Sequence, residues 1–332
     1  MIWAERGEFE KALADSNSAI RLVPNNAMAW FNRAMVHSRL GQWDEALADF
    51  NRSIDIDPNS SDAFLYRGQA CRHRAEIWHS MKETDKALAD LNEAVRVDAT
   101  STGDLFHRAE LWESQKDLEK ALADYDAVIR LRPQSGKTHL RRAIVLQRQG
   151  DLDRAIGDAN EAILLDSANA PAYHWRGYFW ELKGNLDSAL EDYTTAVRLD
   201  PKNSRALENR AGVLKAKGKW QEALSDVAEA LRIDPKYKQP YVVRAWILAT
   251  ADDPQFRDGA GALEAATRAC ELYNWRDAES LACLAAAHAE CGNFGEAVKW
   301  QTKAIERASP EQKDEFERQS ALYESGKPLR AK

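Results

Sequence analysis

The stretch "EALADFNRSIDIDP", residues 45–58, decides the fold because the chain repeats it. Its copies are "KALADSNSAIRLVP" (11–24), "KALADLNEAVRVDA" (86–99), "KALADYDAVIRLRP" (120–133), "RAIGDANEAILLDS" (154–167), "SALEDYTTAVRLDP" (188–201) and "EALSDVAEALRIDP" (222–235). Most copies begin 34 residues after the one before. A fixed period of this length indicates an array of stacked repeats rather than one large core.

Each repeat is expected to contain two helices. In the stretch "AWFNRAMVHSRLGQW" that precedes residue 44, Trp30, Ala34 and His37 are spaced as residues on one face of a helix. A glycine, which ends a helix without strain, follows this first helix at Gly41, Gly150, Gly184, Gly218 and Gly292. A proline, which cannot continue a helix, closes the second helix at Pro24, Pro58, Pro133, Pro201 and Pro235. Below, the first helix is called helix A and the second helix B.

Composition limits the classes of partner. Of the 332 residues, 44% are hydrophobic and 30% charged, which is typical of a folded protein and not of a disordered one. The net charge of −7 gives no general attraction to nucleic acid or to an anionic membrane. No apolar run approaches the roughly 20 residues of a membrane span, and the first residues lack the pattern of a signal peptide. We expect a cytoplasmic protein without nucleic-acid or membrane partners.

Motifs that carry catalytic chemistry are missing from the sequence. There is no CxxC pair, no G-x-S-x-G, no P-loop and no H-E-x-x-H. The stretch "CRHRAEIWH" places Cys71 and His79 on one helix face, but His73 points elsewhere, so a metal site is not expected. We therefore predict no catalytic residue, no metal, no cofactor and no enzymatic activity.

The repeats resemble the tetratricopeptide repeat. That family has a large residue at position 4, small residues at positions 8, 20 and 27, and proline at position 32. In the repeat at 27–60 these positions hold Trp30, Ala34, Ala46, Ser53 and Pro58. The resemblance covers about eight and a half units and implies an all-α, right-handed α-α superhelix, a solenoid. The last part of the chain is similar to the C-terminal repeat regions of bacterial multidomain proteins of this family.

The repeat boundaries follow from this alignment. The expected segments are a truncated first repeat at 1–26, six repeats at 27–60, 61–101, 102–135, 136–169, 170–203 and 204–237, two divergent repeats within 238–310, and a capping helix and tail at 311–332. The repeat that begins at Ser61 has seven extra residues, which we place in helix A and its loop, within "CRHRAEIWHSMKETD". The repeat from Lys238 has five extra residues near "TADDPQFRDGAG". The capping helix is expected to bury Phe316, Leu322 and Tyr323.

Two rows of opposite charge run through the repeats at positions 7 and 23. The first row is Arg33, Arg67, Arg108, Arg142, Arg176, Arg210 and Arg244; the second is Asp15, Asp49, Asp90, Asp124, Asp158, Asp192 and Asp226. An arginine row can also bind phosphate, but a matching carboxylate row favours ion pairs, because a buried charge needs a partner. Each aspartate lies 18 residues before an arginine. This constant spacing predicts that each aspartate pairs with the arginine of the following repeat and fixes the stacking register.

The resemblance also implies a binding surface, because helix A lines the concave face in this family and positions 2, 5, 6, 9, 12 and 13 face the ligand. The ligand-facing candidates are Phe31, Met35, Tyr66, Phe106, His107, Lys137, Arg141, Arg148, His174, Trp175, Tyr178, Arg205, Asn209 and Trp246. The repeat at 136–169 contributes three cations, Lys137, Arg141 and Arg148, which favours an acidic peptide or a C-terminal carboxylate at this point.

Three functions are compatible with the sequence. The leading hypothesis is a non-enzymatic scaffold that binds an extended peptide or a partner helix in the concave groove. A second is a regulatory or substrate-docking segment of a larger enzyme whose catalytic domain precedes Met1, because the first repeat begins within its helix A. A third is self-assembly into a homo-oligomer through the apolar residues of the half-repeat, Ile2, Trp3 and Phe9.

Overall fold

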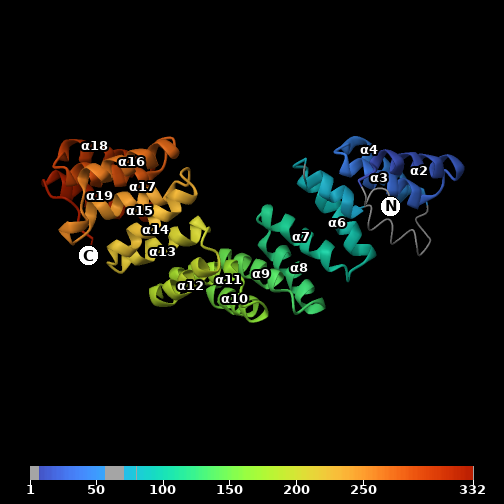
Figure 1. Ribbon diagram of the computed structural model, residues 1–332, viewed down its shortest axis with the longest axis horizontal. Helices are drawn as coiled ribbons and strands as arrows, with labels where there is room; N and C mark the ends of the chain where they lie inside the picture. Colours follow the sequence, from blue (N-terminus) through green and yellow to red (C-terminus); the bar gives the residue numbers. More distant parts are fainter. Residues whose placement is uncertain (1–6, 57–70, 80, 332) are drawn as a thin grey trace. The chain divides into compact units, whose positions relative to one another are not determined.

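The computed structural model describes residues 7–56, 71–79 and 81–331, and within these ranges every regular element is a helix (Figure 1). The chain forms two compact units, Met1–Leu165 and Asp166–Lys332. Within the described ranges, no helix combines the length and the apolar character needed to cross a membrane. The predicted residues Ile2, Trp3, Pro58, Tyr66 and Arg67 lie outside the described ranges.

The first unit is built from helix pairs. Its elements are α2 (Phe9–Leu22), α3 (Ala27–Arg39), α4 (Trp43–Ile56), the helical residues 71–79, α6 (Thr84–Val97), α7 (Thr102–Ser114), α8 (Leu118–Leu131), α9 (Gly136–Arg148) and α10 (Leu152–Leu165). The two helices of a repeat pack together, as α3 does on α4 and α7 on α8, and helix A also packs on helix B of the preceding repeat, as α9 does on α8.

The second unit continues the pattern. Its elements are α11 (Ala170–Leu182), α12 (Leu186–Leu199), α13 (Ser204–Ala216), α14 (Trp220–Ile233), α15 (Gln239–Thr250), the 3₁₀ turn η1 (Pro254–Phe256), α16 (Gly259–Leu272), α17 (Ala278–Glu290), α18 (Phe294–Arg307) and α19 (Pro310–Glu324). Neighbouring helices pack in chain order, with α17 against α18 and α18 against α19. The predicted all-α array of helix pairs with a C-terminal capping helix is confirmed.

In most repeats the short turn between helix A and helix B contains a left-handed residue. Gly150 fills this position after α9 with φ 85°. The repeats at 61–101 and 102–135 lack a glycine here and place Lys82 and Lys116 in the same conformation, with φ 63° and 64°. The left-handed region disfavours residues with a Cβ, so these two lysines are strained where glycine would not be.

The core of each helix pair depends on alanine. Ala109 of α7 and Ala121 of α8 are fully buried, as are Ala143 of α9 and Ala155 of α10. A small side chain at the crossing lets two helices approach closely, and larger residues such as Tyr125 fill the space around it. This packing places helix A and helix B of each repeat in a constant register.

The C-terminal end departs from the regular repeat as the sequence predicts. The five extra residues form a loop around η1, and Arg257 in this loop donates to the carbonyl oxygen of Ala251. The capping helix α19 buries Phe316 and Tyr323 against the core of α15–α18, with Leu322 packed beside them. Its N-terminus has a capping box made by Ser309 and Gln312.

Candidate functional site

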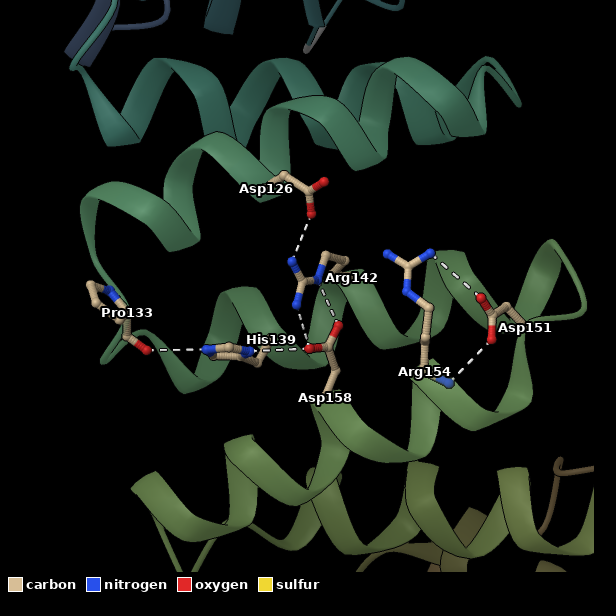
Figure 2. A network of polar contacts seen from close by, with 7 residues as sticks. All are labelled: Asp126, Pro133, His139, Arg142, Asp151, Arg154 and Asp158. Carbon is tan, nitrogen blue, oxygen red and sulfur yellow. Dashed lines mark hydrogen bonds and ion pairs between the residues drawn. The ribbon is translucent and has the colours of Figure 1, made fainter.

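The arginine and aspartate rows do pair, but within a repeat rather than between repeats. Arg142 of α9 donates from Nε and Nη2 to both carboxylate oxygens of Asp158 of α10, at 2.7 and 2.6 Å (Figure 2). The same two-bond geometry joins Arg33 to Asp49, Arg74 to Asp90, Arg108 to Asp124, Arg176 to Asp192 and Arg210 to Asp226. In every pair the aspartate follows its arginine by 16 residues.

The predicted pairing with the following repeat is therefore wrong. Helix A and helix B of one repeat are antiparallel neighbours, so positions 7 and 23 face each other across the pair, and a guanidinium matches a carboxylate there with two parallel bonds. Some arginines also bond to the preceding repeat, but their partner there is the residue two positions after the predicted aspartate. The Nη1 atom of Arg142 bonds to Asp126 at 2.6 Å, and the corresponding atoms of Arg33 and Arg108 bond to Asn17 and Asn92.

The partner of Asp90 in the repeat at 61–101 also differs from the prediction. Arg74 lies 16 residues before Asp90 and pairs with it. The predicted Arg67 lies outside the described residues. At the two ends of the rows, Asp15 and Arg244 are exposed, and Arg244 has Ala265 where the other repeats have their aspartate.

His139 joins the central pair to the loop before it. Its Nδ1 lies 3.2 Å from Asp158, and its Nε2 lies 3.1 Å from the carbonyl oxygen of Pro133 (Figure 2). Trp30 and Tyr241 occupy the same position in their repeats and donate to the carbonyl oxygens of Pro24 and Pro235. Position 4 thus ties helix A to the end of the preceding helix B, with three different side chains.

The three predicted cations of α9 have partners on the structure's own surface. Arg141 bonds to Glu110 at 2.7 Å, and Arg148 lies 3.0 Å from Glu113. Lys137 lies over the ring of Phe106, with Nζ 4.3 Å from the ring centroid. Two of the three positive charges are therefore balanced by glutamates of α7, which removes most of the argument for an acidic ligand at this point.

Two of the predicted ligand-facing aromatic residues are buried. Phe31 is 7% exposed and packs on Phe50 and His73. Phe106 is 8% exposed and meets Tyr125 edge to face at 5.5 Å. Both rings are covered by helix A of the following repeat or by the lysine above them, so they belong to the core more than to a binding surface.

Other candidates in the first unit border open pockets, on the surface formed by α3, residues 71–79, α7 and α9, here called the first helix-A surface. Met35 and His73 line a pocket of about 320 Å³ with Trp43, Glu76 and Ile77. His107 lines a second pocket of about 180 Å³ whose other walls include Arg72, Ala75, Glu76, Leu91, Glu110 and Leu111. Each pocket has an apolar floor and a polar rim, which is the usual form of a site for one side chain of a partner.

The candidates of the second unit lie on its own helix-A surface, formed by α11, α13, α15 and α17. Trp175 meets Tyr178 nearly at right angles, with ring centroids 5.9 Å apart, and stacks on His174. Asn209 donates to Nε2 of His174 at 2.9 Å. Burial, with a smaller effect of the nearby exposed Arg205, lowers the pKa of His174 to about 4. His174 is therefore neutral at pH 7, while Trp246 packs on the core around α15.

Two carboxylates of this surface, the half-buried Glu181 and the buried Glu208, were not among the predicted site residues. Tyr193 donates to Glu181 at 2.8 Å, and Tyr237 donates to Glu208 at 3.0 Å. Burial raises the pKa of Glu208 to about 7, and the hydrogen bond from Tyr237 opposes this shift only in part. A tyrosine on helix B that lies 12 residues after a glutamate on helix A, as in Tyr193 and Tyr125, is the sequence signal that marks such a pair.

In the part of the chain that the structure describes, no three histidine, cysteine, aspartate or glutamate side chains gather as metal ligands would. Cys71 is buried, and the exposed His79 borders the smaller pocket.

Comparison with known families agrees with the helix-pair geometry. One tetratricopeptide repeat model matches residues 39–104, 81–136, 140–204 and 183–238, and two others match residues 1–70 and 278–308. The chain belongs to the tetratricopeptide repeat family. No curated protein matches this tetratricopeptide repeat protein in sequence.

Solved structures share the fold at low sequence identity. The C-terminal part of a tetratricopeptide repeat protein from Cytophaga hutchinsonii superposes with a TM-score of 0.58 at 15% identity, over 76% of this chain and 99% of that one. A tetratricopeptide repeat protein from Parabacteroides merdae gives 0.56 at 13% identity, over 90% and 98%. YrrB, described as a tetratricopeptide repeat protein with an unusual peptide-binding site, gives 0.50 at 19% identity, over 58% and 95%. These likenesses concern the fold.

Proposed function

We propose that this protein is a non-enzymatic scaffold that binds an extended peptide segment of a partner protein on its helix-A surfaces. The observation that carries the proposal is the pair of neighbouring pockets on the first helix-A surface, each with an apolar floor and a polar rim. Repeat arrays use such surfaces because successive helices present similar, evenly spaced sites to an extended ligand. YrrB, which shares the fold, is described as having a peptide-binding site, so the fold is compatible with this role.

The second unit supports the same proposal with different chemistry. Trp175 and Tyr178 are half-buried side chains on its helix-A surface. The exposed Arg205 acts electrostatically on His174, which stacks with Trp175. Rigid aromatic residues with a neighbouring cation are common at the energetic centres of protein interfaces. We expect a partner segment to use one or both surfaces.

Selection of peptides tests the proposal. A library of random short peptides is displayed on phage and selected on the full chain, and the enriched peptides are measured by fluorescence anisotropy. The variants Met35→Ala and Tyr178→Ala alter the two helix-A surfaces. Leu164→Ala is the matched control, because Leu164 is 78% exposed on helix B.

The proposal predicts that each enriched peptide loses affinity for at least one helix-A variant and none for the control. Circular dichroism confirms that each variant is folded. Failure to enrich any peptide, or equal binding to all three variants, would contradict the proposal.

A further inference from the structure

The two pockets of the first helix-A surface lie on either side of one helical segment. The larger pocket lies between α3 and residues 71–79, and the smaller lies between residues 71–79 and α7. Glu76 borders both. Contacts of Phe31 with His73, and of Arg72 with Asp104, hold this segment against its two neighbours.

The floors of the two pockets select apolar side chains. Met35, Trp43 and Ile77 form the floor and wall of the larger pocket, and Trp43 is 40% exposed there. Ala75, Leu91 and Leu111 form the floor of the smaller pocket. Covering this surface with an apolar side chain is favourable by roughly 25 cal/mol per Å² of apolar area removed from water.

The distance between the pockets determines how far apart in a peptide the two side chains that fill them must be. These two side chains are called the anchors. Packed helices lie about 8–10 Å apart. A peptide in the extended polyproline II conformation advances about 3.1 Å per residue with three residues per turn, so its residues i and i+3 face the same side. Pockets on the two sides of one helix are therefore about three residues of such a peptide apart. Anchors at positions i and i+3 fit this separation, and anchors at i and i+2 or i+5 do not.

The charge between the pockets is negative. Arg72 is bound by both carboxylate oxygens of Asp104, and Glu110 is bound by Arg141. Glu76 is exposed, and its ion-pair contact within the described ranges is with His73, whose Nδ1 lies 3.2 Å away. The hydrogen bond from His73 is the main cause that lowers the pKa of Glu76, so its carboxylate is ionised at neutral pH. Arg39 borders the larger pocket and not the smaller one.

We infer that the first helix-A surface holds an extended peptide with two large apolar residues at positions i and i+3 and a lysine or arginine between them, whose cation pairs with Glu76. This inference rests on the proposed function and specifies the partner's chemistry. It differs from the sequence-based expectation of an acidic ligand, because the cations behind that expectation are paired with glutamates of the protein itself.

A charge-swap selection tests the inference. The same phage library is selected in parallel on the wild-type chain, on Glu76→Lys and on Glu76→Gln. Glu76 is exposed, so all three proteins are expected to fold, and circular dichroism checks this. Wild type should enrich apolar residues three positions apart with lysine or arginine between them, and Glu76→Lys should enrich aspartate or glutamate at the same place.

Binding measurements on the best wild-type peptide complete the test. Its affinity should fall on the order of tenfold on Glu76→Lys, which corresponds to about 1.4 kcal/mol, and less on Glu76→Gln. Insertion of one residue between its anchors should abolish binding. If peptides are enriched but their charge pattern is the same on wild type and Glu76→Lys, this inference is wrong and the proposed function stands. If no peptide is enriched on any of the three proteins, both are wrong.

Discussion

Arg142 donates two hydrogen bonds to Asp158 across the helix pair of one repeat, and its third nitrogen donates to Asp126 of the preceding repeat. One side chain thus connects the two helices of its own repeat and links them to the preceding repeat. The hydrogen bonds that Arg142 donates to Asp158 and Asp126 raise its pKa, so it is charged at neutral pH. Asp158 is 6% exposed, so the two bonds from Arg142 satisfy a buried carboxylate.

The within-repeat pairing can be measured as a coupling energy. A double-mutant cycle of Arg142→Ala with Asp158→Ala should give a coupling of about 1–3 kcal/mol in the free energy of unfolding, because the two residues are in contact. The cycle of Arg142→Ala with Asp124→Ala should give a value near zero, because Asp124 pairs with Arg108. Urea unfolding followed by circular dichroism supplies both values. A stronger coupling of Arg142 to Asp124 than to Asp158 would contradict the pairing within a repeat and support the pairing between repeats.

The single substitution Asp158→Ala should cost about 3–5 kcal/mol, since it removes the carboxylate that accepts two of the three hydrogen bonds of a half-buried guanidinium and leaves only the bond to Asp126. Glu161→Ala is the control on the same helix, because Glu161 is exposed, and it should change the free energy of unfolding by less than about 0.5 kcal/mol. A small effect of Asp158→Ala, equal to that of Glu161→Ala, would mean that the pair contributes nothing to stability.

The strained turn before α8 predicts a stabilising substitution. Lys116 has φ 64°, where the repeat at 136–169 has Gly150. Lys116→Gly should raise the free energy of unfolding by up to about 1 kcal/mol by relieving this strain. Lys120→Gly, inside α8, should lower it by a similar amount. Thermal unfolding of the three proteins measures both effects; a lower midpoint for Lys116→Gly would show that the turn is not strained.

The buried carboxylate of Glu208 predicts a pH dependence of stability. Its pKa is about 7 in the folded protein and 4.5 in the reference state, so between these values the folded state keeps a proton that the unfolded state releases. The contribution of this group to stability is therefore complete below pH 4.5 and is lost as the pH rises through 7, with an amplitude of about 3 kcal/mol.

Glu208→Gln keeps the contact with Tyr237 and removes the titration, so it should stabilise the protein above pH 7 and have little effect below pH 4.5. Unfolding midpoints across this range test the prediction, with the exposed Glu222→Gln as control. A difference between Glu208→Gln and wild type that does not change with pH would contradict it. Glu181, Glu279 and Lys215 also act on this carboxylate, and they are present in both proteins.

The cysteines should differ in reactivity. Cys71, Cys270 and Cys283 are buried, and burial raises the pKa of Cys270 to about 12 and that of Cys283 well above its usual value. Cys291 is exposed. Because the thiolate is the reactive form, a maleimide should label one thiol quickly, and peptide mapping should place it at Cys291. Cys291→Ser is the control and should lose this fast labelling phase. Labelling of Cys283 as fast as that of Cys291 would contradict the burial of Cys283 in α17.

Much of the fold follows from the sequence because it depends on local signals. Helix periodicity, the turn glycines and the alanines at the helix crossings specify each helix pair without information from distant residues. The pairing of the charge rows was predicted incorrectly, because the repeat at 61–101 contains both Arg67 and Arg74. The choice of Arg67 made the spacing to the preceding aspartate constant, whereas the contact to Asp90 comes from Arg74.

The candidate binding surface was harder to predict because it depends on side chains from neighbouring repeats. Arg141 and Arg148 look like free cations along the chain, yet Glu110 and Glu113 of the preceding helix A bind them. The prediction that Phe106 faces the ligand also failed, because Lys137 of the next repeat covers its ring. Glu76 has no distinguishing signal along the chain, because the pockets on its two sides are formed with side chains of neighbouring repeats.

The central claim, that partners bind on the helix-A surfaces, is tested most directly by hydrogen–deuterium exchange of the full chain with and without an enriched peptide. Binding should slow exchange in helix-A segments, such as residues 71–79 and α7 or α11 and α13, and leave helix-B segments such as α8 and α12 unchanged. Protection confined to the helix-B segments, or to the ends of the chain, would contradict the claim.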